Sequence, residues 1–274
     1  MDVEPIIAFF IDSGAGKIFR VMVVTFARPL GLLFGFYLFA WVFRAAITLR
    51  ISIAAAISLP VLVVNIDALE VIAAGRVSLS LVPLVGKEFL IGYAFGFLGS
   101  LPFLVVIFAG AMIDGMRGEG NSGHTEPIGG DMMSTSSSMF LVIAAFAFMS
   151  FDGLWRLVAD FYVSYDIWPI GAFFPVIADD AVGTVLTIFG DILLSAATVA
   201  LPMLLLFASV ELILGIASRL SERFTPYQLA FPLRNLLYIL SLPVVAWGIW
   251  EMSGDITADS MGLSSLLQQI LLMR

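Results

Sequence analysis

Residues 89–113 form a run of 25 residues without a single charge. The hydrocarbon core of a bilayer is about 30 Å thick, and a helix needs roughly 20 apolar residues to cross it. This run is therefore long enough to span a membrane. It leads into a polar, glycine-rich segment, residues 110–124, which we predict to be a loop at the mouth of the span.

Composition extends the membrane prediction to the whole chain. Of 274 residues, 61% are hydrophobic and only 12% are charged, too few to cover the surface of a soluble domain. The net charge of −8 argues against a nucleic-acid partner, because the chain has no cluster of Lys and Arg that could neutralise several phosphates. No cysteine is present, which excludes disulfides and thiolate metal sites. The first residues are acidic, so we expect no cleaved signal peptide.

Hydropathy predicts an all-α membrane protein with about six spans, some of them broken helical hairpins. We expect one polytopic domain over residues 1–250 and an acidic, partly amphipathic tail over residues 251–274. Two weaker stretches, 71–86 and 167–178, are predicted to be packed or interfacial helices. The predicted spans are 21–43, 51–66, 89–113, 132–151, 192–210 and 229–250.

Motifs for catalysis or cofactor binding are incomplete. Gly14, Gly16 and Lys17 resemble part of a phosphate loop, but Ile18 stands where a magnesium-binding hydroxyl is required. Residues 118–123 have dinucleotide-binding spacing, yet they follow a membrane run instead of a strand. His124 is the only histidine, which excludes sites built on two histidines. We therefore expect no enzyme, no cofactor and no metal.

Some ionisable side chains lie inside or beside the apolar runs. At mid-bilayer each costs roughly 2.5–3.5 kcal/mol on insertion scales, so such residues normally face protein, a cavity or a partner charge. Arg28, Lys87 and Glu88 lie near the ends of runs, where snorkelling to water is as good an interpretation as burial. For Glu211 and Arg234 we favour a buried ion pair.

Small residues support close helix packing near these charges. Gly215 follows Glu211 by one turn, and Pro232 precedes Arg234 inside an apolar run. Two Gly-x-x-x-Gly patterns, which are typical of helix contacts, occur elsewhere, although 24 glycines make such matches frequent. These patterns are Gly31 with Gly35 and Gly92 with Gly96.

Several segments, taken in order and spacing, resemble the T-type export-gate subunit of type III secretion systems, the SctT/FliR/SpaR/YscT family. The first half carries Lys87-Glu88 with Gly92, Pro102-Phe103, and the stretch from Ala109 to Gly118; the second half carries Ala200 to Pro202, Glu211 to Arg219, and Phe231 to Arg234. The resemblance covers essentially the whole chain. One stretch departs from the family: residues 221–225 read Ser-Glu-Arg-Phe-Thr where Ala-Pro-Gln-Leu-Asn is usual.

The resemblance implies a non-enzymatic structural and gating subunit of a protein-conducting channel across the bacterial inner membrane. We favour an injectisome over a flagellar machine. The implied partners are R-type, S-type and U-type export-apparatus subunits, secreted unfolded proteins and membrane lipid. The family also implies that the assembled core is displaced toward the periplasm, so that hydropathic spans need not face lipid.

Two sets of residues acquire roles from the resemblance. The segment 110–123 would be a pore plug, in which Asp114 and Arg117 face one another on a helical turn and can pin the loop; a mobile solvent loop is the alternative. The plug residues are Gly110, Ile113, Asp114, Met116, Arg117 and Gly118. The residues for buried charge or partner packing are Lys87, Glu88, Glu211, Gly215, Arg219, Pro232 and Arg234.

A secondary transporter is the alternative function. Asp191, Glu211 and Arg234 would then form an intramembrane relay for protons or anions. No inverted repeat, the usual accompaniment of such a relay, is visible in the sequence. A membrane-embedded hydrolase would rest on His124 alone.

Overall fold

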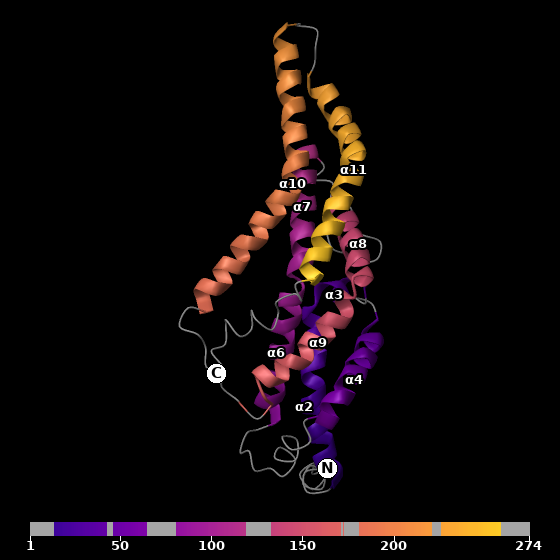
Figure 1. The fold of residues 1–274 in the computed structure, drawn as a ribbon, viewed down its shortest axis with the longest axis vertical. Coiled ribbons are helices and arrows are strands. Elements are labelled where there is room, and N and C mark those ends of the chain that lie inside the picture. Colours follow the sequence, from indigo (N-terminus) through magenta and orange to yellow (C-terminus); the bar gives the residue numbers. More distant parts are fainter. Residues whose placement is uncertain are drawn as a thin grey trace, which may run out of the picture. The chain divides into compact units, whose positions relative to one another are not determined.

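The computed structural model describes residues 14–42, 46–64, 81–118, 133–170, 172, 181–220 and 226–258 (Figure 1). Within these ranges the chain forms helices joined by short turns and contains no strand, which confirms the all-α prediction. The chain divides into two compact units, each built from separate chain segments.

The first unit comprises Met1–Ser100, Leu157–Ala181 and Gly262–Arg274. Its described helices are α2 (Gly14–Gly35), α3 (Tyr37–Val42), α4 (Ile47–Val64), α6 (Leu81–Gly99) and most of α9 (Gly153–Ile167).

Glycines bring α2 and α6 into backbone contact. A Cβ added to Gly92 would lie 1.9 Å from the carbonyl oxygen of Arg28, and one added to Gly31 would lie 2.2 Å from that of Phe89. The contacts advance in the same direction along both helices, so α2 and α6 run parallel. The two predicted Gly-x-x-x-Gly contacts are therefore confirmed, as a single interface. The same approach recurs one turn further on, at Gly35 with Tyr93 and Gly96 with Leu32.

The second unit comprises Leu101–Arg156 and Val182–Met261. Its helices are α7 (Leu101–Arg117), α8 (Thr135–Ser150), α10 (Ala181–Leu220) and α11 (Pro226–Ala258). α7 and α8 run antiparallel: the rings of Phe103 and Phe148 meet edge to face at 5.3 Å, while the Ser137 hydroxyl donates to the carbonyl oxygen of Ile107 at 2.7 Å.

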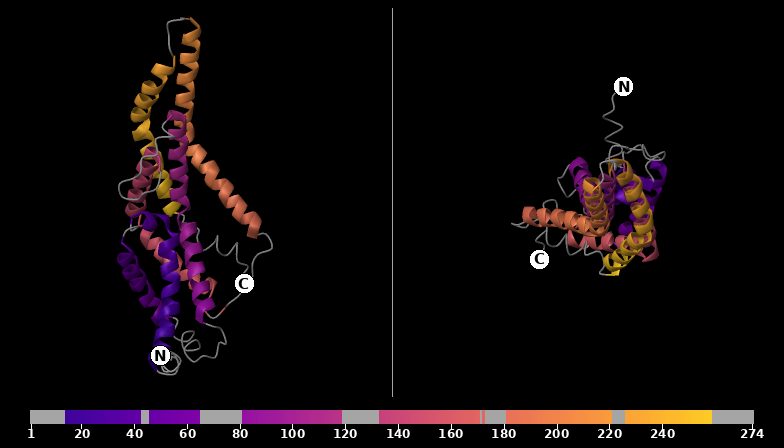
Figure 2. Two further views of the ribbon diagram at one scale, coloured as in Figure 1. Left: turned by 180° about the vertical axis from the view of Figure 1, so that it is seen from behind. Right: turned by 90° about the horizontal axis from the view of Figure 1, so that it is seen from above.

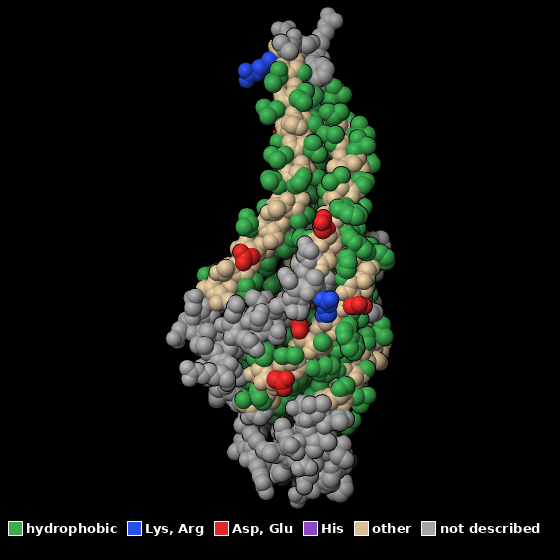
Figure 3. All heavy atoms as spheres, in the orientation of Figure 1, with side chains coloured by type: hydrophobic (Ala, Val, Ile, Leu, Met, Phe, Trp, Pro, Cys, Tyr) green, Lys and Arg blue, Asp and Glu red, His purple; other side chains and the backbone are tan. Residues whose placement is uncertain are grey.

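Helices α10 and α11 are the longest in the described chain, with 40 and 33 residues. They lie side by side over part of their lengths (Figures 1 and 2), around Val210, Leu214 and Ala230. Most of their large apolar side chains point outward, and hydrophobic side chains dominate the face seen in Figure 3. Exposed apolar surface of this extent is typical of helices covered by lipid or by other chains.

Three described helices are long and apolar enough to cross a membrane, Leu81–Gly99, Gly183–Arg219 and Leu229–Gly254, and a fourth span results if the bent pair α8 and α9 counts as one. The predicted span 89–113 is wrong as one helix, because α6 ends at Gly99 and α7 begins at Leu101. Pro102 accounts for the new start: proline fits the first turn of a helix, whereas in a helix interior it removes a hydrogen bond.

The predicted loop from residue 110 is wrong in its first part, because α7 continues through Arg117. Gly118 then adopts a φ of 88°, which favours glycine and ends the helix. Residues 251–258 of the predicted tail continue α11. Residues 71–80, 119–124 and 259–274 lie outside the described residues. The single domain over residues 1–250 stays a prediction, since two compact units do not establish independent folding.

Candidate functional site

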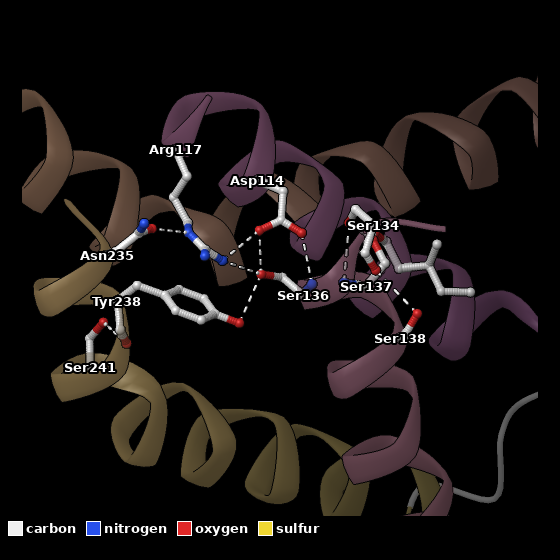
Figure 4. A network of polar contacts seen from close by, with 10 residues as sticks. Asp114, Arg117, Ser134, Ser136, Ser137, Ser138, Asn235, Tyr238 and Ser241 are labelled. Atoms are coloured by element: carbon white, nitrogen blue, oxygen red, sulfur yellow. Dashed lines mark hydrogen bonds and ion pairs between the residues drawn. The ribbon is translucent and has the colours of Figure 1, made fainter. Parts of the chain in front are cut away.

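The buried carboxylate of Asp114 joins the end of α7 to the start of α8 (Figure 4). Its Oδ2 accepts the backbone N–H of Ser136 at 2.7 Å, and its Oδ1 accepts the Ser136 hydroxyl at 2.6 Å. Ser134 caps the same helix by accepting the N–H of Ser137. The first N–H groups of a helix lack intrahelical partners and carry a partial positive charge. Asp114 therefore complements the start of α8 by both hydrogen bonding and charge.

Arg117 extends this network to α11. Its Nη1 donates to Oδ1 of Asp114 at 2.8 Å, so the prediction that these two residues face each other is confirmed. Its Nε donates to Oδ1 of Asn235 at 3.0 Å, and its guanidinium lies 3.8 Å from the ring centre of Tyr238. The hydroxyls of Tyr238 and Ser136 share a hydrogen bond of 2.8 Å. Charge-assisted bonds thus connect α7, α8 and α11 at one point (Figure 4).

Arg234 forms a second connection between α11 and the end of α7. Its Nη1 donates to the carbonyl oxygen of Met116, one of the last carbonyls of α7, which lack intrahelical partners. Its Nη2 lies 3.1 Å from Oε1 of Glu211 on α10. The predicted pair is therefore present. Its predicted burial is wrong within this chain, because the Glu211 side chain is 49% exposed.

The other residues predicted for partner packing on α10 and α11 face outward. A Cβ added to Gly215 would meet no described atom within 4 Å, so the helix contact expected there is not made within the described part of the chain. Arg219, in the last turn of α10, and Pro232, inside α11, are also exposed.

A separate cluster of buried charges joins α2 and α6 in the first unit. Nε of Arg28 lies 2.7 Å from Oε2 of Glu88, and Nζ of Lys87 lies 2.7 Å from Oε1. At most 8% of any of these side chains is exposed, so burial is the correct interpretation for them and snorkelling is wrong.

The two cations of this cluster also hold the end of α9 and the turn after it. Arg28 donates to the carbonyl oxygens of Ser164 at 3.0 Å and Trp168 at 2.8 Å. Lys87 donates to those of Ile170 at 3.0 Å and Ala172 at 2.9 Å. Carbonyls at a helix C-terminus carry a partial negative charge, so two cations suit this position.

The pairing of Arg28 with Glu88 was not predicted, although the sequence contained a signal for it. Arg28 precedes Gly31 by three residues, and Glu88 precedes Gly92 by four. The glycines of α2 and α6 pack together in register. The charged residue that precedes the glycines on one helix, Arg28, therefore meets the charged residue that precedes them on the other, Glu88. The arrangement positions helices; every charged group described in it has an internal partner.

Comparison with known proteins gives one family. Residues 19–260 match the profile of bacterial export proteins, family 1. The chain is 29% identical over 173 residues to Yop proteins translocation protein T of Yersinia pestis, covering 60% of this chain and 63% of that protein. It is 26% identical over 194 residues to the surface presentation of antigens protein SpaR of Salmonella typhimurium, covering 69% and 70%. It is 28% identical over 159 residues to the flagellar biosynthetic protein FliR of Pectobacterium carotovorum, covering 57% and 59%. The chain thus spans less than two thirds of the length of the Yersinia relative.

Proposed function

We propose that this chain, which belongs to family 1 of the bacterial export proteins, is a non-enzymatic structural and gating subunit of a type III secretion export apparatus. Its long apolar helices and its family support a multi-pass position in the bacterial inner membrane. The similarity to Yop proteins translocation protein T, SpaR and FliR supports the family role. Among its possible settings we favour an injectisome.

The observation that carries the gating proposal is the network around Asp114. It connects α7 just before Gly118 with α8 just after residue 132, so that one set of contacts holds both ends of the intervening segment. Gly110, Ile113, Asp114 and Arg117 are buried in this unit, which suits the fixed base of a plug. Met116 and Gly118 are exposed and suit its outer side.

The outward-facing apolar surfaces of α10 and α11 support a role in a hetero-oligomer. We propose R-type, S-type and U-type export-apparatus subunits as the chains that cover them, with Glu211, Gly215, Arg219 and Pro232 among the contacting residues. Glu88 already contacts α2, and Lys87 contacts the turn after α9, so we assign them internal support. We further propose that unfolded secreted proteins pass through the assembled channel, whose core is displaced toward the periplasm.

Deletion of residues 119–123 tests the gating proposal. The deletion spares Gly110, Ile113, Asp114 and Arg117, so the base of the plug keeps its contacts. We expect higher ion permeability of cells that express the assembled complex, with complex yield unchanged. Replacing the same five residues by an equal length of Gly and Ser separates the effect of sequence from that of length. Unchanged permeability of the deletion variant in an intact complex would remove the plug assignment.

A further inference from the structure

Arg234 has more hydrogen-bonding capacity than its present contacts use. Its Nη1 donates to the Met116 carbonyl on α7, and its Nη2 pairs with Oε1 of Glu211 on α10 at 3.1 Å. Its Nε is buried and has no hydrogen-bond partner among the described residues. A buried N–H without an acceptor is destabilising, so another position of the guanidinium that satisfies Nε would compete with the present one.

Glu211 offers the acceptor that Nε lacks. Only Oε1 is engaged, whereas Oε2 makes no polar contact with a described residue and the side chain is half exposed. Nε and Nη2 of a guanidinium form a planar fork that matches the two oxygens of a carboxylate. Closing this fork on Glu211 would satisfy Nε and draw Nη1 away from Met116.

We propose that Arg234 is a latch with two positions. In the first it caps the Met116 carbonyl at the end of α7, and in the second it binds Glu211 through both oxygens and leaves that carbonyl uncapped. The meaning of the switch rests on the proposed function, because residues 110–118 carry both the proposed base of the plug and its outer side. Asn235 holds Arg117 in either position, so the latch loosens the last turn of α7 without undoing the network around Asp114.

Glu211 controls which position is taken. Its side chain is 49% exposed, so a positively charged group of a neighbouring chain can reach the second carboxylate oxygen. Such a group would occupy the acceptor that Nε needs and hold the latch on Met116. Partner contact on α10 would in this way stabilise the end of α7.

The absence of cysteine makes this switch measurable. Met116→Cys introduces a single thiol at a position that is 36% exposed and keeps the backbone carbonyl. Met139→Cys, on α8 of the same unit and 39% exposed, is the matched control. The rate of reaction with a small maleimide is measured for each thiol in the purified full-length chain in detergent.

Arg234→Lys replaces the fork by one ammonium group, which the carboxylate of Glu211 attracts away from the neutral Met116 carbonyl. We expect the Met116→Cys thiol to react roughly three- to tenfold faster, because a modest shift of the population toward the second latch position loosens the last turn of α7. The Met139→Cys thiol should keep its rate. Adding Glu211→Gln removes that attraction, so the rate at position 116 should return toward its parent value.

An unchanged rate after Arg234→Lys overturns the latch, as does a further increase when Glu211→Gln is added. An equal increase at the Met139→Cys thiol also overturns it, because Arg234 would then stabilise the whole unit. The readout does not involve export. A failed latch therefore leaves the proposed function standing, and failed secretion or co-purification leaves the labelling result unaffected.

Discussion

Nε of Arg28 on α2 lies 2.7 Å from Oε2 of Glu88 on α6, and neither side chain is more than 1% exposed. The pair sits directly beside the glycine contacts that join the two helices. Lys87 shares the same acid, because its Nζ lies 2.7 Å from the other carboxylate oxygen of Glu88. It also hydrogen-bonds to the carbonyls after α9.

Arg28→Met should therefore destabilise the first unit more than Lys87→Met. Removing one partner of a buried ion pair costs about 3–5 kcal/mol. Arg28 is fully buried and also binds the carbonyls of Ser164 and Trp168, whereas Lys87 is 8% exposed and its loss leaves the fully buried Arg28–Glu88 pair in place. Thermal unfolding of the detergent-solubilised chain, followed by tryptophan fluorescence, measures the difference. Arg219→Met, at an exposed position, is the control and should change stability by less than about 0.5 kcal/mol. Equal effects of all three substitutions would contradict the buried cluster.

Gly92→Ala should separate α2 from α6. The new Cβ would lie 1.9 Å from a backbone oxygen that no side-chain rotation can move, and overpacking of this kind costs about 1–3 kcal/mol or more. Gly215→Ala is the matched control: it meets no described atom within 4 Å and should raise helix stability by up to about 1 kcal/mol. The unfolding temperatures of the two purified variants should move in opposite directions; a shift of the same sign and size in both would count against the α2–α6 interface.

The apolar runs were enough to predict where helices exist, but not the break between α6 and α7 or the continuation of α7 past Gly110. The sequence predicts a loop that starts at Gly110, because glycine is common in turns. In the structure this glycine serves close packing, since a Cβ there would lie 2.4 Å from the backbone nitrogen of Ser137. The same residue type has both uses, and only the neighbouring helix decides between them.

Only the part of the candidate site that depends on local sequence could be predicted. The pairing of Asp114 with Arg117 follows from helical spacing and needed only local sequence. The rest of the network contacts Arg117 from far along the chain: Ser136 lies 19 residues after it, and Tyr238 lies 121 residues after it, close to Asn235. No periodic pattern in the sequence indicates such contacts. The outward position of Glu211 also depends on how α10 meets α11, which composition does not determine.

Gly118→Asp should leave the assembled gate leaky. Gly118 has a φ of 88°, and a carboxylate there would stand one turn from Asp114 and at the negative end of the α7 dipole. Gly118→Asn is the control, because asparagine tolerates this backbone conformation and carries no charge. Permeability of cells that express each assembled variant is the measurement. Equal permeability for the two, with normal assembly, would exclude charge at this position as a factor in closure.

Asp191→Asn separates a passive channel from the alternative of a proton-coupled transporter. A relay needs a titratable group, which an amide cannot supply. Asp191 is exposed on α10 of this chain, and asparagine has nearly its shape. We expect both complex assembly and protein secretion to be retained. Secretion that stops while the complex assembles normally would favour the transporter.

Native mass spectrometry of the complex purified through this chain in mild detergent tests the central claim most directly. An export-gate subunit should appear in one species, in a fixed ratio with other small membrane proteins that match R-type and S-type subunits. The chain alone, or a homo-oligomer that contains nothing else, would contradict the proposed function.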